Sequence, residues 1–310
     1  MRGSFAVLAS GFVVLSFAQT IDPFYAGDYS YTSLGSVPDL PTSYGGLTLK
    51  FDDPNTLLIG GAANGAAGAI YSIGVTRDGN NHITGFSGSA TLFATAPQID
   101  GGLAYGPGNV LFAAGFPNNA IMQFKLGSSS PDRNDDVSGI GIASSLGALN
   151  FVPAGFNGAG RMKAVSFSTG GFYDVLFSAD GVGTYNLDSA TLADTIIGGP
   201  EGFVYVPQGS ALFGVQSMLV SEWSVGNIAA YDIDAQGNPI FATRRDFMTG
   251  LSGAEGAFID PLTGDFLFST FGGSNQVIVV QGFSAPVPEP ATMAALGIGV
   301  LALIRRRKSK

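Results

Sequence analysis

One pattern recurs along the middle of the chain and limits what the chain can fold into. An acidic residue or a glycine is followed by glycine, a short apolar strand, a proline or glycine turn and a second apolar strand. Clear copies are DGGLAYGP at residues 100–107, EGFVYVP at 201–207 and EGAFIDP at 255–261, and GLTLKFD at 46–52 is a weaker one. Most copies continue to a third strand, as in NAIMQF at 119–124 and NQVIVV at 275–280. Three or four short strands per repeat, at a period of about 40–50 residues, are typical of propeller blades.

The repeats predict an all-β propeller, with about five or six blades between residues 19 and 285. The 46 glycines and the low charged fraction of 12% argue against a helical protein, which would be rich in charged helix formers and poor in glycine. Residues 151–187 fit least well, because their strands lack the acidic-Gly opening. A β-sandwich is therefore the alternative architecture. Because the chain has no cysteine, disulfides, thiol catalysis and Cys-ligated zinc are excluded.

The charge balance is strongly acidic and disfavours nucleic acid as a partner. The chain has 14 basic and 23 acidic residues, and six of the basic residues lie in the two terminal segments. Without those segments the net charge is about −15, which would repel a polyanion. Divalent cations and neutral sugars are more compatible partners.

The first 18 residues have the three parts of a secretory signal. Arg2 supplies a basic start, residues 5–17 form an apolar run, and small residues stand before a cleavage site between Ala18 and Gln19. We therefore expect an N-terminal signal helix over residues 1–18, followed by a mature domain over residues 19–285.

The last 25 residues contain a second targeting pattern. Val287-Pro288-Glu289-Pro290 precedes an apolar run over residues 291–304, which is followed by Arg305, Arg306 and Arg307. This order of a Pro-Glu-Pro motif, a short hydrophobic helix and a basic cluster resembles the PEP-CTERM sorting signal. The resemblance implies that residues 286–310 are a sorting tail, that an exosortase-type membrane enzyme recognises the motif, and that the protein reaches the cell envelope. A plain C-terminal membrane anchor is the alternative.

The blade sequences also carry a resemblance. EGFVY at 201–205 and EGAFIDPLTGD at 255–265 resemble propellers of the gluconolactonase, strictosidine synthase and NHL types, most clearly over residues 200–283. In lactonase-like propellers, oxygen ligands from several blades hold one divalent cation in the central channel. The resemblance implies that Asp100, Glu201 and Glu255, which share the opening position, face the channel and bind Ca²⁺. The competing interpretation is that each acidic residue only closes the turn before its strand.

A second acidic segment partly fits a calcium loop. Asp132, Asn134 and Asp136 offer oxygen ligands at alternating positions, but Val137 and Ala143 replace the glycine and glutamate that an EF-hand requires. A looser surface Ca²⁺ site is the remaining hypothesis, against a solvated acidic loop.

These features favour an exported binding or structural propeller of the cell envelope or extracellular matrix, with exopolysaccharide or another surface protein as its partner. No further Asn or Asp set matching a lactonase is evident, so the sequence leans against an enzyme. A metal-dependent lactonase or related hydrolase that uses the channel acids is the first alternative. An adhesion module for another surface protein is the second.

Overall fold

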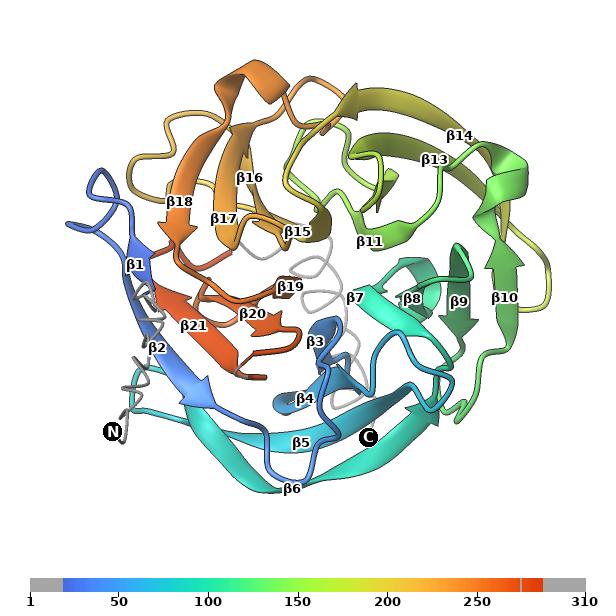
Figure 1. Cartoon of the computed structure of the whole chain (residues 1–310), viewed down its shortest axis with the longest axis horizontal. Helices are drawn as coiled ribbons and strands as arrows, with labels where there is room; N and C mark the ends of the chain where they lie inside the picture. Colours follow the sequence, from blue (N-terminus) through green and yellow to red (C-terminus); the bar gives the residue numbers. More distant parts are fainter. Residues whose placement is uncertain (1–18, 274, 287–310) are drawn as a thin grey trace, which may run out of the picture.

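The computed structural model describes residues 19–273 and 275–286, which form five antiparallel sheets arranged around a central axis (Figure 1). Four of these sheets have four strands and one has five. The architecture is a five-blade β-propeller, so the predicted all-β propeller is confirmed and the sandwich alternative is not adopted. The signal segment and the sorting tail, residues 1–18 and 287–310, lie outside the described residues.

Each blade runs from an innermost strand at the axis to an outermost strand at the rim. From inside to outside, blade 1 contains β3 (Leu47–Lys50), β4 (Asp53–Gly61), β5 (Ala69–Arg77) and β6 (Ile83–Thr95). Blade 2 contains β7 (Ile99–Tyr105), β8 (Leu111–Gly115), β9 (Ala120–Phe124) and β10 (Arg133–Asp136). Blade 3 contains β11 (Leu146–Phe151), β12 (Met162–Ser166), β13 (Gly171–Ala179) and β14 (Tyr185–Thr195). Blade 4 contains β15 (Pro200–Tyr205), β16 (Ser217–Glu222), β17 (Asn227–Asp232), β18 (Arg245–Thr249) and β1 (Thr20–Ile21). Blade 5 contains β19 (Ala254–Ile259), β20 (Phe266–Thr270), β21 (Val277–Gln281) and β2 (Ser30–Gly35). The short 3₁₀ helices are η1 (Pro107–Asn109), η2 (Val137–Ile140) and η3 (Phe241–Thr243).

The hydrophobic core is divided among the contacts between neighbouring blades. Leu219 of blade 4 and Phe268 of blade 5 belong to one cluster, and Ile59 of blade 1 and Leu267 of blade 5 belong to another. Three further clusters join blades 1 and 2, blades 2 and 3, and blades 3 and 4. Because both faces of a middle strand are covered by other blades, strands such as β8 are apolar without alternation and wholly buried.

The N-terminal segment closes the ring. β2 is the outermost strand of blade 5 and pairs antiparallel with β21, with Tyr31 opposite Val280. β1 adds a short fifth strand to blade 4, with Ile21 opposite Met248. Strands from the two ends of the propeller domain therefore hydrogen-bond in one sheet, which ties the first blade to the last.

The loop between β1 and β2 contributes one hydrogen bond that can be tested in isolation. The buried Tyr29 hydroxyl donates to the carbonyl of Ala211 in blade 4 at 2.5 Å. We expect Tyr29→Phe to lower the free energy of unfolding by about 1 kcal/mol, because the ring is kept and one hydrogen bond is lost. Tyr31→Phe is the control, since its exposed hydroxyl bonds to Gln19. Thermal unfolding followed by circular dichroism measures both, and equal melting temperatures would contradict the expectation.

Candidate functional site

The acidic residue at the opening position of blades 2, 4 and 5 lies at a β-bulge at the start of the innermost strand. The pairing register shifts between Ile99 and Leu103 in blade 2, and corresponding shifts occur at the starts of β15 and β19. A bulge leaves a residue unpaired and re-aims its side chain. Asp100, Glu201 and Glu255 are therefore directed together at one end of the channel, although each comes from a different blade.

A ring of glycines makes this convergence possible. The residue after the opening position is glycine in all five blades: Gly46, Gly101, Gly147, Gly202 and Gly256. A Cβ on Gly101 would lie 1.8 Å from the carbonyl oxygen of Glu201, and one on Gly202 would lie 2.3 Å from that of Glu255. Since no side chain fits at these distances, the inner strands approach one another more closely than any other residue would permit.

The three carboxylates form one buried cluster. Each offers an oxygen that lies within 4.8 Å of the others, and the most exposed of the three, Glu201, has a relative accessibility of 6%. One oxygen on each residue is buried and has no hydrogen-bond partner. The side-chain amide of Asn64, oriented with its nitrogen inward, donates to Asp100 Oδ1 at 2.8 Å. Buried polar atoms are normally satisfied, so three unpartnered carboxylate oxygens at one place call for a ligand or for shared protons.

The electrostatics of the cluster favour the neutral acids when no cation is present. Burial raises the pKa of Asp100 to about 7, although hydrogen bonds involving the two glutamates and Asn64 act in the opposite direction. Burial also raises the pKa of Glu201 and of Glu255 well above the usual value, and the neighbouring carboxylates add to both shifts. A divalent cation at the centre would remove this cost by pairing with the ionised forms.

The cluster has the donor chemistry that a hard cation requires. Ca²⁺ takes oxygen ligands at about 2.3–2.6 Å, so two ligands on opposite sides of one ion stand about 5 Å apart. The observed separations of up to 4.8 Å are compatible with this spacing. Asp100, Glu201 and Glu255 could thus hold one ion between blades 2, 4 and 5.

The structure also identifies the residues at the opening position in the two other blades. Gly45 occupies it in blade 1, and Leu146 occupies it in blade 3, so neither blade adds a carboxylate. The pair Leu146-Gly147 was missed in the sequence because only its glycine follows the pattern. Asn64 was also missed, since it lies in the β4–β5 turn, far from the opening motif in sequence.

The second acidic segment lies at the rim. Asp132 precedes β10, the outermost strand of blade 2, while Asn134 and Asp136 lie within it, and all three are exposed. Alternate residues on a strand are about 6.6 Å apart, a wide spacing for ligands of one ion. Asp132 pairs with Lys125 Nζ at 3.2 Å, and Asp136 accepts from the Ser138 amide at 2.8 Å. These contacts are those of a turn and a helix cap.

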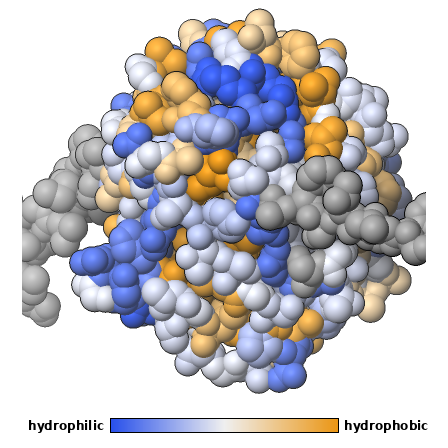
Figure 2. Space-filling model, turned by 60° about the vertical axis from the view of Figure 1, so that its left-hand side comes forward, coloured by the Kyte–Doolittle hydropathy of each residue, from blue (hydrophilic) through white to orange (hydrophobic). Residues whose placement is uncertain are grey.

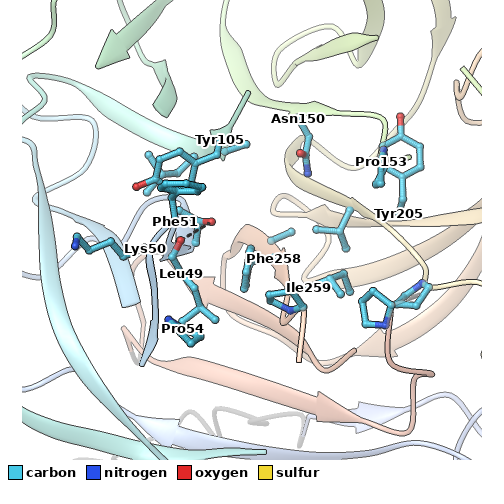
Figure 3. A pocket seen from close by; sticks show the side chains of 18 of the residues that line it. Leu49, Lys50, Phe51, Pro54, Tyr105, Asn150, Pro153, Tyr205, Phe258 and Ile259 are labelled. Atoms are coloured by element: carbon cyan, nitrogen blue, oxygen red, sulfur yellow. Dashed lines mark hydrogen bonds between the residues drawn. The ribbon is translucent and has the colours of Figure 1, made fainter. Parts of the chain in front are cut away.

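A cavity opens at the other end of the channel. It has a volume of about 580 Å³ and is lined by the last residues of the inner strands and by the loops that follow them (Figure 3). Aromatic rings of Phe51, Tyr105, Tyr205 and Phe258 contribute to its wall. The carboxylate cluster and this cavity are therefore two separate features of the same axis.

The comparisons with known proteins bear first on the C-terminal tail. The model of the PEP-CTERM protein-sorting motif matches residues 286–308. The chain carries a PEP-CTERM sorting motif. This motif indicates export to the cell envelope and processing by an exosortase-type membrane enzyme, as the sequence predicted. Among residues 19–273 and 275–286, no helix is long and apolar enough to cross a membrane.

Several solved propellers are similar to the chain in fold. The PQQ domain of pyranose dehydrogenase from Coprinopsis cinerea has 9% identity and a TM-score of 0.47, with 86% of this chain and 97% of that chain covered. A gluconolactonase from Xanthomonas campestris has 13% identity and a TM-score of 0.45, with 86% and 84% covered. The PQQ-bound aldose sugar dehydrogenase from Streptomyces coelicolor has 14% identity and a TM-score of 0.40, with 80% and 83% covered. No curated protein matches the sequence. At these values the likeness assigns no chemistry to this chain.

Proposed function

We propose that the protein is an exported structural and binding component of the cell envelope, and that its central carboxylates hold one divalent cation. Ca²⁺ is the cation best suited to three carboxylates. The observation that carries the proposal is the set of buried, unpartnered oxygens on Asp100, Glu201 and Glu255, which come from three different blades. An ion bound there would cross-link these blades.

A structural ion fits the surroundings of the cluster better than a catalytic one. The cluster is buried, and the ring of glycines separates it from the cavity at the opposite mouth. The described residues that line that cavity include no carboxylate and no histidine, which are the side chains that most often act as general bases.

Within the envelope, we place the propeller in the extracellular matrix, with transient membrane attachment through residues 291–304. Exopolysaccharide is the partner that the acidic, cation-binding domain would accept most readily. The adhesion alternative would require a broad apolar patch. On the face in Figure 2, hydrophobic residues are interspersed with hydrophilic ones, which gives that alternative no support there.

Calorimetric titration of the protein with CaCl₂ tests the cation. We expect one site, which disappears in the triple variant Asp100→Asn/Glu201→Gln/Glu255→Gln. The matched control is Asp132→Asn/Asp136→Asn, which alters two exposed carboxylates of blade 2 and should bind as the unmodified chain does. Absence of binding, or binding lost only in the control, would refute the proposed centre.

The lactonase alternative rests on the same carboxylates, since a bound cation can polarise a carbonyl or activate water. An assay of aldonolactone hydrolysis by the Ca²⁺-loaded protein, in which the released acid is measured, distinguishes the two functions. Turnover that needs the cation and is lost in the triple variant would favour the lactonase. Cation binding without turnover would favour the structural role.

A further inference from the structure

The cavity at the channel mouth has the lining of a peptide-binding groove. Phe51 and Tyr105 stand side by side with ring centroids 6.1 Å apart, and Tyr205, which is 4% exposed, lies on the opposite side of the cavity with Phe258 between them (Figure 3). Phe51 is 50% exposed, so part of this aromatic surface is open. Grooves lined by aromatic side chains recognise proline-rich segments, which hold an extended polyproline II conformation at little entropic cost.

The end of the described chain leads into this cavity. Beyond β21, Phe283 packs into the core between blades 4 and 5. The Ser284 amide then donates to Ser210 Oγ at 3.0 Å, and the Ser284 carbonyl packs against Gly264, 2.1 Å from where a Cβ would stand. Pro286 is itself part of the cavity wall. The described part of the chain therefore ends at the cavity.

The segment that follows has the matching chemistry. Val287-Pro288-Glu289-Pro290 contains two prolines and one charge. Among the described residues of the cavity wall, Lys50 alone is charged. Its side chain is 32% accessible, and its ammonium lies 2.6 Å from the exposed Asp52. In a polyproline II conformation, four residues span about 12 Å, a length suited to crossing a cavity of this volume.

We propose that the cavity docks the sorting motif, residues 287–290 of the same chain, with its prolines against the aromatic wall and Glu289 beside Lys50. Docking covers the segment that the sorting enzyme must read, so the folded propeller and the enzyme compete for it. Recognition then depends on release of the motif from the cavity. This inference is independent of the proposed cation.

Disulfide trapping tests the contact, because the natural chain has no cysteine. The full chain in mild detergent carries Pro288→Cys together with Pro54→Cys, an exposed position on the cavity wall. The control pair combines Pro288→Cys with Ser189→Cys, an exposed position on the outermost strand of blade 3. After addition of a mild oxidant, we expect the cavity pair to lose its free thiols at least tenfold faster than the control pair.

Two further measurements make the result decisive. Phe258→Ala in the cavity pair should slow the reaction at least threefold, while circular dichroism verifies that the propeller is folded. The rate at which the cavity pair loses its free thiols should not depend on protein concentration. Equal rates in both pairs, no cross-link in either, or a rate that rises with concentration, which indicates the tail of a second molecule, would each overturn the proposal.

Discussion

Gly101→Ala should prevent the five blades from closing into a stable ring. The added Cβ would stand 1.8 Å from the carbonyl oxygen of Glu201 and 3.2 Å from the Glu201 Cβ. The obstructing atoms belong mainly to backbone on another blade, so no side-chain rotation can relieve the overlap. Overpacking in a core usually costs about 1–3 kcal/mol, and we expect this site to exceed that range because two inner strands must separate. Loss of soluble protein, or a melting temperature lowered by about 10 °C, would be the outcome.

Gly79→Ala is the matched control for this prediction. Gly79 lies in the turn between β5 and β6, and nothing stands within 4 Å of its added Cβ. We expect its melting temperature to change by less than about 2 °C, since exposed substitutions without new contacts usually have small effects. Equal stabilities of Gly101→Ala and Gly79→Ala would show that the channel is wider than the glycine ring implies.

Without a divalent cation, the protein should lose stability as the pH rises from about 4 to 8. Asp100 has a folded-state pKa of about 7, against about 4 for an unfolded chain, because burial disfavours its charge. Below pH 4 both states are protonated and there is no penalty. Above that, the native state binds a proton that the unfolded state releases, so the free energy of unfolding falls until the folded pKa is passed. A shift of this size corresponds to about 4 kcal/mol for Asp100 alone. Glu201 and Glu255 shift in the same direction.

Calcium should cancel this loss. Unfolding in urea at pH 5 and pH 8, with EDTA or with excess CaCl₂, measures how the free energy of unfolding depends on pH and on Ca²⁺. At 100 times the dissociation constant, a bound ion adds about 2.7 kcal/mol at pH 8 and less at pH 5, where protons compete for the ligands. The triple variant Asp100→Asn/Glu201→Gln/Glu255→Gln should respond weakly to both pH and Ca²⁺. A natural chain that is equally stable at pH 5 and pH 8 in EDTA would contradict the raised pKa values.

The opening motif could be read in three blades because it combines chemistry with conformation. Asp100-Gly101, Glu201-Gly202 and Glu255-Gly256 mark a strand that begins where space is restricted, and the glycine is needed whatever the ligand. In blade 3 the restricted space still requires a glycine, Gly147, but the residue before it is the uncharged Leu146, so the acidic-Gly motif is absent. The motif therefore predicted the shared position of the three acids, whereas their separation depends on bulges that no local pattern specifies.

The amino-acid sequence by itself determined the repeat, the all-β class and the sorting motif, because each depends on residues close together in the chain. Only the tertiary structure decided the blade number, the closure of blade 5 by β2, the meeting of the carboxylates within 4.8 Å and the arrival of Pro286 at the aromatic cavity. These features join residues separated by about 50 to 250 positions. Such contacts follow from how blades pack around an axis, and strand periodicity and turn chemistry, which are local, do not encode them.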